Sequence, residues 1–141
     1  MQRRENWHVD LAAFLQERRD RPFEWGKHDC CLFVCDAIQA HTGLDLGEAF
    51  RGKYTDAISA ARVMKAYAGA GVAAVAEKIA ADHHIPEIPP FFAQRGDVAL
   101  FAGEHGEMLG IVDLNGRHIV STGENGLERV PLEQAMRAWH L

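Results

Sequence analysis

The pattern of the sequence changes at a proline-rich connector between residues 83 and 90. Pro86, Pro89 and Pro90 interrupt regular structure there, because proline fixes φ and lacks a backbone N–H. Before the connector, apolar residues recur at helical spacing, and after it short apolar runs alternate with turn residues. Helices followed by a meander of strands predict an α+β fold, with N-terminal helices packed on a small antiparallel sheet. The 141 residues fit a single domain spanning residues 1–141.

The sequence predicts four helices and four strands at definite places. The helices are expected at residues 10–20, 30–41, 55–67 and 72–81, with Asp10 capping the first and Gly43 ending the second. Strands are expected at residues 97–102, 109–113, 117–121 and 127–130, with Asn115-Gly116 as a hairpin turn. A last helical turn is expected from Leu132 to Trp139.

The charge of the chain argues against a nucleic-acid partner. The formal net charge is −5, and 25% of residues are charged, so no basic footprint of the kind that binds phosphate backbones is expected. Basic residues do occur near the N-terminus, but acidic residues interleave with them, which is typical of a solvated helix face. These basic residues are Arg3, Arg4, Arg18, Arg19 and Arg21.

Cysteine usage and hydropathy indicate where the chain folds. Three cysteines within six residues cannot form a disulfide framework across a fold, which favours folding in a reducing cytosol. No apolar segment follows Met1, and no run approaches the roughly 18 apolar residues of a membrane span. We therefore expect neither a signal peptide nor a membrane span.

The stretch W-G-K-H-D-C-C-L-F-V-C, residues 25–35, is the part of the chain whose residue types suit chemistry. Asp29 can cap a helix that begins at Cys30 and continues through apolar residues. Free amide N–H groups and the positive helix end would stabilise a thiolate at that position and lower its pKa. This is how a cysteine nucleophile is prepared.

Core packing is the alternative interpretation of the same cysteines, because free cysteine is among the most buried residue types. An i, i+3, i+4, i+7 stripe should face the core, and Cys30 lies outside it. The stripe consists of Cys31, Val34, Cys35 and Ile38. A metal site is not expected, because the cysteines lack C-x-x-C spacing and His83-His84 fits a loop pair. No cofactor is expected either.

The motif W-G-x-x-D-C followed by an apolar helix resembles the nucleophile motif of the NlpC-type cell-wall peptidases. These are papain-like cysteine hydrolases that cut peptide bonds in peptidoglycan. With the later R-G-K-Y and G-D-V-A-L-F, the run also resembles a small family of phage tail-associated proteins related to that fold. The resemblance covers roughly residues 23–130. It implies a papain-like NlpC-type fold, with Cys30 as the nucleophile and with Trp25 and Asp29 beside the substrate.

One position departs from the family's pattern. The NlpC-type histidine opens a strand of the form H-V-G-I, and here Met108-Leu109-Gly110-Ile111 matches it. Met108 is expected to face Cys30 on the substrate side, but a thioether cannot accept the thiol proton. His105 and His118 are then the candidate bases, and His28 lies near the thiol in the sequence.

Two functions from different classes follow from the resemblance. The first is a phage tail-tip or baseplate component with a structural role or a degenerate peptidase site, made in the host cytoplasm and carried in the virion. Its expected partners are other tail-tip proteins. The alternative is an active cysteine peptidase that cleaves peptidoglycan stem peptides, with Cys30 as nucleophile and His105 or His118 as base.

Overall fold

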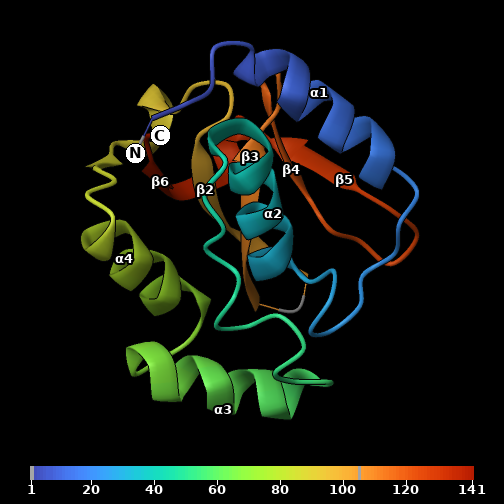
Figure 1. Cartoon of the computed structure of the whole chain (residues 1–141), viewed down its shortest axis with the longest axis vertical. Coiled ribbons are helices and arrows are strands. Elements are labelled where there is room, and N and C mark those ends of the chain that lie inside the picture. The colour runs from blue at the N-terminus through green and yellow to red at the C-terminus, as the bar shows by residue number, and fades with distance from the viewer. Residues whose placement is uncertain (1, 105) are drawn as a thin grey trace.

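Helices occupy the N-terminal part of the chain and strands the C-terminal part, as the sequence predicts (Figure 1). The structure is a computed structural model that describes residues 2–104 and 106–141. The helices are α1 (Trp7–Arg18), α2 (Cys30–Thr42), α3 (Ala57–Ala68) and α4 (Val72–Asp82). The strands are β1 (Glu87–Ile88), β2 (Val98–Gly103), β3 (Gly106–Val112), β4 (His118–Ser121), β5 (Glu128–Pro131) and β6 (Ala135–Trp139). Two 3₁₀ segments are η1 (Pro90–Phe92) and η2 (Leu132–Gln134).

Both ends of α2 lie where the sequence predicts them to within a residue. The Asp29 side chain accepts a hydrogen bond from the Leu32 N–H at 2.9 Å, so Asp29 is the N-cap and Cys30 the first helical residue. At the other end Gly43 adopts a left-handed conformation, with φ 86°. Its N–H donates to the Gln39 carbonyl, which is the usual way a glycine ends a helix.

The first helix begins earlier than predicted. It starts at Trp7 after Asn6, and Asp10 lies in the first turn instead of at the cap. Trp7 packs against His41 of α2 with ring centroids 5.8 Å apart, and this tertiary contact extends the helix beyond its local signal. The third helix begins at Ala57, because Asp56 and Ser59 form a capping box.

The strands form one antiparallel sheet in the order β1-β6-β2-β3-β4-β5. The β2–β3 hairpin pairs Val98 with Ile111 at one end and Gly103 with Gly106 at the other. The predicted turn between β3 and β4 is confirmed: the Gly116 N–H donates to the Asp113 carbonyl, and Gly116 has φ 70°.

The predicted C-terminal helical turn over Leu132–Trp139 is wrong. After η2 the chain forms β6, which lies between β1 and β2. Ala138 and Trp139 are both buried, on opposite faces of the sheet, and the pairing with two neighbours satisfies the backbone. These long-range pairings override a local sequence that is compatible with a helix.

The two faces of the sheet carry separate apolar clusters. Side chains facing α2 join the main core, whereas alternate residues on the other face pack among themselves and against the 3₁₀ segments. The strand residues of the main core are Val98, Leu100, Leu109, Ile111, Val120 and Trp139. Those of the second cluster are Ala99, Phe101, Val112, Ile119 and Ala138, with Met108 partly buried beside them.

The two ends of the chain lie close together (Figure 1). Buried Asp97 accepts hydrogen bonds from the Arg3 guanidinium at 2.9 Å and from the Leu141 N–H at 3.2 Å. No helix in residues 2–104 and 106–141 is both long enough and apolar enough to cross a membrane.

Candidate functional site

Cys30 lies at the first position of α2, partly exposed, with its thiol against β3. Burial by the surrounding protein raises the pKa of this thiol to about 11, and the Asp29 carboxylate raises it further. A hydrogen bond from the Leu109 backbone amide and the amides of Cys30 and Cys31 act in the opposite direction, but they do not balance the burial. The expectation of a lowered thiol pKa is therefore wrong: at neutral pH Cys30 is a protonated thiol.

Cys31 and Cys35 are core residues, as the stripe predicts. Their side chains are buried, together with Val34 and Ile38. The pKa of the Cys31 thiol lies well above its ordinary value, because it hydrogen-bonds with Cys35 and is removed from water. Both thiols therefore serve packing.

Asp29 is buried and fully engaged by the protein. Its Oδ1 accepts from the Leu32 N–H, and its Oδ2 accepts from the Gly26 N–H at 3.0 Å and from the Tyr54 hydroxyl at 2.7 Å. Burial and the neighbouring Asp29 raise the pKa of Tyr54 far above its ordinary range, which keeps this hydroxyl a donor. Asp29 thus caps α2 and fixes the segment around Tyr54 to it.

The glycine of the W-G pair is required by close packing. Gly26 has φ 78°, and a Cβ there would overlap the Tyr54 carbonyl oxygen. The adjacent Gly52 N–H donates to the Gly26 carbonyl at 2.8 Å. Trp25 is 36% exposed and lies edge-on to Phe23 and Tyr54, with centroids 4.8 and 6.4 Å away. Among the residues predicted to bind substrate, Trp25 therefore remains partly exposed beside this loop.

Two of the candidate histidines, His118 and His28, lie in the described part of the chain, and their ring nitrogens contact groups other than the thiol. His118, at the start of β4, has its Nδ1 2.9 Å from the Asn115 amide nitrogen. His28 is buried, its Nδ1 lies 3.3 Å from the Pro22 carbonyl, and its ring packs edge-on against Phe33. Burial lowers the pKa of His28, and the Arg21 and Arg18 charges lower it further. The third candidate, His105, lies outside the described residues.

Met108 does not face the Cys30 helix. It pairs with Phe101 in the β2–β3 hairpin and packs with the second cluster, on the face turned away from α2. Leu109 occupies the face toward α2 and joins the main core. The expectation that Met108 faces the thiol is wrong because strand alternation gives the α2 face to Leu109.

Sequence reasoning missed the two groups that touch the site most closely. One is Tyr54, whose hydroxyl donates to Asp29 and whose only signal in the sequence is the R-G-K-Y run. The Leu109 amide could not be assigned from the sequence, because a backbone group carries no residue-type signal. Among residues 2–104 and 106–141, no group of three or more His, Cys, Asp and Glu side chains could hold a metal ion.

Comparisons with known proteins agree with this geometry at the level of the fold. A family model described as a domain of unknown function (DUF6950) matches residues 2–141. The chain belongs to this family. The fold also matches the crystal structure of the NlpC/p60 domain of the peptidoglycan hydrolase SagA, with a TM-score of 0.58 and 14% sequence identity. That match covers 95% of this chain and 98% of the other, and no curated protein matches the chain.

The likeness to the NlpC/p60 domain confirms the predicted α+β, NlpC-type fold of this DUF6950 protein. At 14% identity the likeness establishes the fold alone. Within that fold the site offers a partly exposed thiol at a helix start, a buried carboxylate and a Tyr hydroxyl. Among the described residues, the side-chain hydrogen bonds of histidines go to groups other than the Cys30 thiol.

Proposed function

We propose that this protein is a component of a phage tail tip in which an NlpC-type fold serves as a structural module without peptidase activity. The observation that carries the non-catalytic part of the proposal is the state of Cys30, whose pKa is raised to about 11 by burial. A thiol hydrolase needs a thiolate, and the raised pKa leaves very little of it at neutral pH.

The surroundings of Cys30 support the same conclusion. The four described histidines that form hydrogen bonds bond to groups other than the thiol. Met108 stands where the resembling peptidases have histidine, and it packs on the opposite face of the sheet. The cap itself adds a carboxylate beside the sulfur, which opposes ionisation.

The assignment to a tail tip rests on the resemblance of the W-G-K-H-D-C-C-L-F run, with R-G-K-Y and G-D-V-A-L-F, to tail-associated phage proteins. A hydrolase fold without hydrolysis is consistent with a docking role among neighbouring tail proteins. Immunogold labelling of purified virions tests the placement. We expect label at the tail tip, and absence of the protein from purified virions would contradict it.

An active peptidase is the second candidate, and the position of Cys30 favours it. The cysteine begins a helix that packs on β3, the strand that His105 precedes. In that mechanism the Cys30 sulfur attacks a peptide carbonyl of the stem, its proton passes through a histidine to the leaving amine, and water releases the acyl group.

Digestion of purified peptidoglycan decides between the two candidates. The full-length protein and its Cys30→Ala variant are incubated with peptidoglycan, and new peptide ends are sought by mass spectrometry, with the NlpC/p60 domain of SagA as the positive control. We expect no difference between the wild type and the variant. Peptide products released by the wild type but absent with Cys30→Ala would overturn the non-catalytic role.

A further inference from the structure

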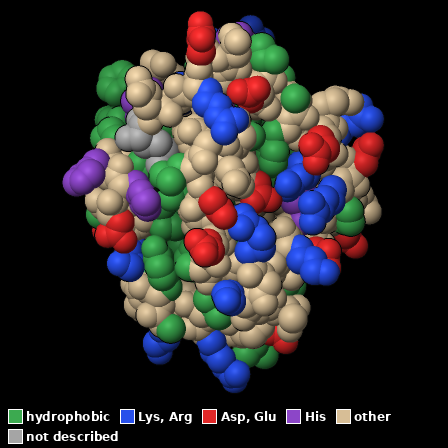
Figure 2. All heavy atoms as spheres, in the orientation of Figure 1, with side chains coloured by type: hydrophobic (Ala, Val, Ile, Leu, Met, Phe, Trp, Pro, Cys, Tyr) green, Lys and Arg blue, Asp and Glu red, His purple; other side chains and the backbone are tan. Residues whose placement is uncertain are grey.

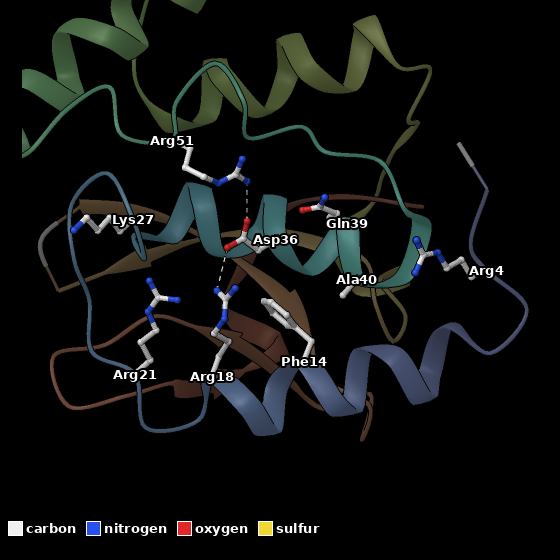
Figure 3. Close-up of a pocket in the computed structure, with 9 residues that line it drawn as sticks. All are labelled: Arg4, Phe14, Arg18, Arg21, Lys27, Asp36, Gln39, Ala40 and Arg51. Carbon is white, nitrogen blue, oxygen red and sulfur yellow. Dashed lines mark hydrogen bonds and ion pairs between the residues drawn. The ribbon is translucent and has the colours of Figure 1, made fainter.

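A groove between α1 and α2 lies outside the site around Cys30. Its volume is about 620 Å³, within the range of pockets that hold small molecules. Figure 3 shows side chains from both helices and from the segments beside them converging on it. The lining residues are Arg4, Phe14, Arg18, Arg21, Lys27, Asp36, Gln39, Ala40 and Arg51.

The lining is strongly basic, although the chain as a whole is acidic. Five of the nine lining side chains are Arg or Lys and one is acidic, whereas the whole chain carries a formal net charge of −5. Figure 2 shows Lys and Arg side chains gathered on the right half of this face, with acidic side chains among them. Residues that the sequence places on a solvated helix face are thus brought together by the fold.

The single lining carboxylate is already neutralised. Asp36 accepts from the Arg18 Nη1 through one oxygen at 3.0 Å and from the Arg51 Nη2 through the other at 2.9 Å. Arg51 also bonds to Asp45, at 3.0 and 3.1 Å, so it serves mainly to hold the wall of the groove. The repulsion that Asp36 would exert on an incoming anion is therefore largely cancelled.

Three of the cations remain available to a ligand. Within residues 2–104 and 106–141, Arg4 and Arg21 have no carboxylate within 4.0 Å. Lys27 has only Glu24 at 3.5 Å, and both side chains are more than half exposed. Such exposed pairs contribute little and exchange readily for a better partner.

Arg18 is prepared for binding by its surroundings. Its guanidinium stacks over the Phe14 ring at 4.7 Å, and its side chain is only 16% exposed. Its Nε is buried, with the exposed Glu17 carboxylate 3.8 Å away, so a ligand would meet the outer nitrogens of the guanidinium. A guanidinium held in this way loses little freedom when an anion binds.

The cations are distributed along the length of the groove. Lys27, Arg21 and Arg18 lie toward one end of the groove and Arg4 at the other (Figure 3). Gln39 and Ala40 lie between Asp36 and Arg4 in this view, offering an amide and an apolar surface.

We propose that the groove between α1 and α2 binds a small organic polyanion through its phosphate groups. One phosphate would be held by Arg18, Arg21 and Lys27, because planar guanidinium groups match phosphate oxygens bidentately. A second anionic group would reach Arg4, with Phe14 and Ala40 beneath the body of the ligand. The site is separate from Cys30 and does not depend on any peptidase activity.

Titration of the full chain with inorganic tripolyphosphate, measured by isothermal titration calorimetry at low and high NaCl, tests the proposal. Saturable 1:1 binding is expected, and it should weaken as salt rises. Citrate serves as the carboxylate comparison and should bind more weakly. No saturable binding at low salt would overturn the site, and tighter binding of citrate would overturn the phosphate class.

Variants locate the binding in the groove. Arg21→Gln should weaken tripolyphosphate binding about tenfold, the value of one charge-assisted contact. Arg62→Gln removes the same charge from exposed α3, away from the groove, and should leave the affinity unchanged. Equal weakening by both variants would show attraction to charge in general and would overturn the proposal.

A second measurement does not depend on the variants folding. Backbone amide NMR of the wild-type protein, titrated with tripolyphosphate, should show shifts centred on Arg18, Lys27 and Gln39. The chemical shifts of the amides in α3 and α4 should not change. Shifts confined to other regions would place the anion elsewhere and contradict the proposal.

Discussion

Cys30 experiences two opposing electrostatic influences, and their balance decides what the residue can do. Amide groups at the start of α2 and the Leu109 amide favour the thiolate, whereas burial and the Asp29 carboxylate favour the neutral thiol. Burial is the largest contribution, so the pKa rises to about 11. An aspartate N-cap places a negative charge directly beside the sulfur that the helix end would otherwise activate.

Serine substitutions should separate the three cysteines. Cys31→Ser and Cys35→Ser each bury a hydroxyl in the main core, and we expect each to lower the free energy of unfolding by about 1–3 kcal/mol. Cys30→Ser, at the partly exposed helix start, should cost less than about 1 kcal/mol. Urea unfolding of the three variants checks the ranking, and a larger loss for Cys30→Ser would contradict it.

Removal of Asp29 should cost more than removal of an ordinary helix cap. Asp29→Ala leaves the Gly26 and Leu32 amides and the buried Tyr54 hydroxyl without their acceptor. We expect a loss of at least about 3 kcal/mol, because each unsatisfied buried group adds to the cap. Asp56→Ala, at the exposed cap of α3, is the matched control and should cost about 1 kcal/mol. Equal losses in thermal or urea unfolding would show that the bonds of Asp29 add nothing to capping.

At the level of elements, the sequence predicts what local chemistry determines. Asp29 and Gly43 mark the ends of α2, and Asn115-Gly116 marks the β3–β4 turn, because caps and turns depend on a few neighbouring residues. The strand β6 was not predicted, because its pairing with β2 joins residues far apart in the chain.

The candidate site was only partly predictable for a related reason. The motif places Cys30 and Asp29 correctly, but the facing strand residue depends on the register and the pleat of β3. A shift of one residue along β3 decides whether Met108 or Leu109 faces α2, and the structure has Leu109 on that face. The thiol pKa depends on burial, which follows from packing of the whole chain and not from the motif.

Met108→His tests the face assignment of β3. Because Met108 packs with the second cluster, an imidazole there should not reach the Cys30 sulfur. We expect the rate of Cys30 alkylation by iodoacetamide at neutral pH to equal that of the wild type within about twofold. A clear increase, or gain of peptidoglycan cleavage, would place residue 108 on the thiol side and contradict the assignment.

At the level of the whole molecule, folding holds several acidic groups in their neutral forms. Burial raises the pKa of the Cys30 thiol and of the Tyr54 hydroxyl. The hydrogen bond with Cys35, together with burial, raises the pKa of the Cys31 thiol. A group whose pKa is raised by folding binds its proton more tightly in the native state. Its contribution to stability is complete below the unfolded pKa and is lost as the pH rises toward the folded pKa.

Stability should therefore fall in alkaline solution, beginning near the ordinary thiol pKa of about 8.5. Between there and about pH 11, each such thiol lowers the free energy of unfolding by at most about 1.4 kcal/mol per pH unit. Urea unfolding at about pH 8, 9 and 10 measures the slope. Cys30→Ala should show a shallower slope than the wild type, and identical slopes would contradict the raised pKa of Cys30.

The pH dependence of Cys30 alkylation tests the central claim most directly, that this NlpC-type fold holds an inactive thiol. Native protein is treated with iodoacetamide between about pH 7 and pH 10, with circular dichroism to confirm folding, and labelling of the Cys30 peptide is followed by mass spectrometry. A pKa of about 11 predicts a rate that rises about tenfold per pH unit across this range without a plateau. A plateau with an apparent pKa at or below about 8 would reveal a thiolate prepared for catalysis and would contradict the account.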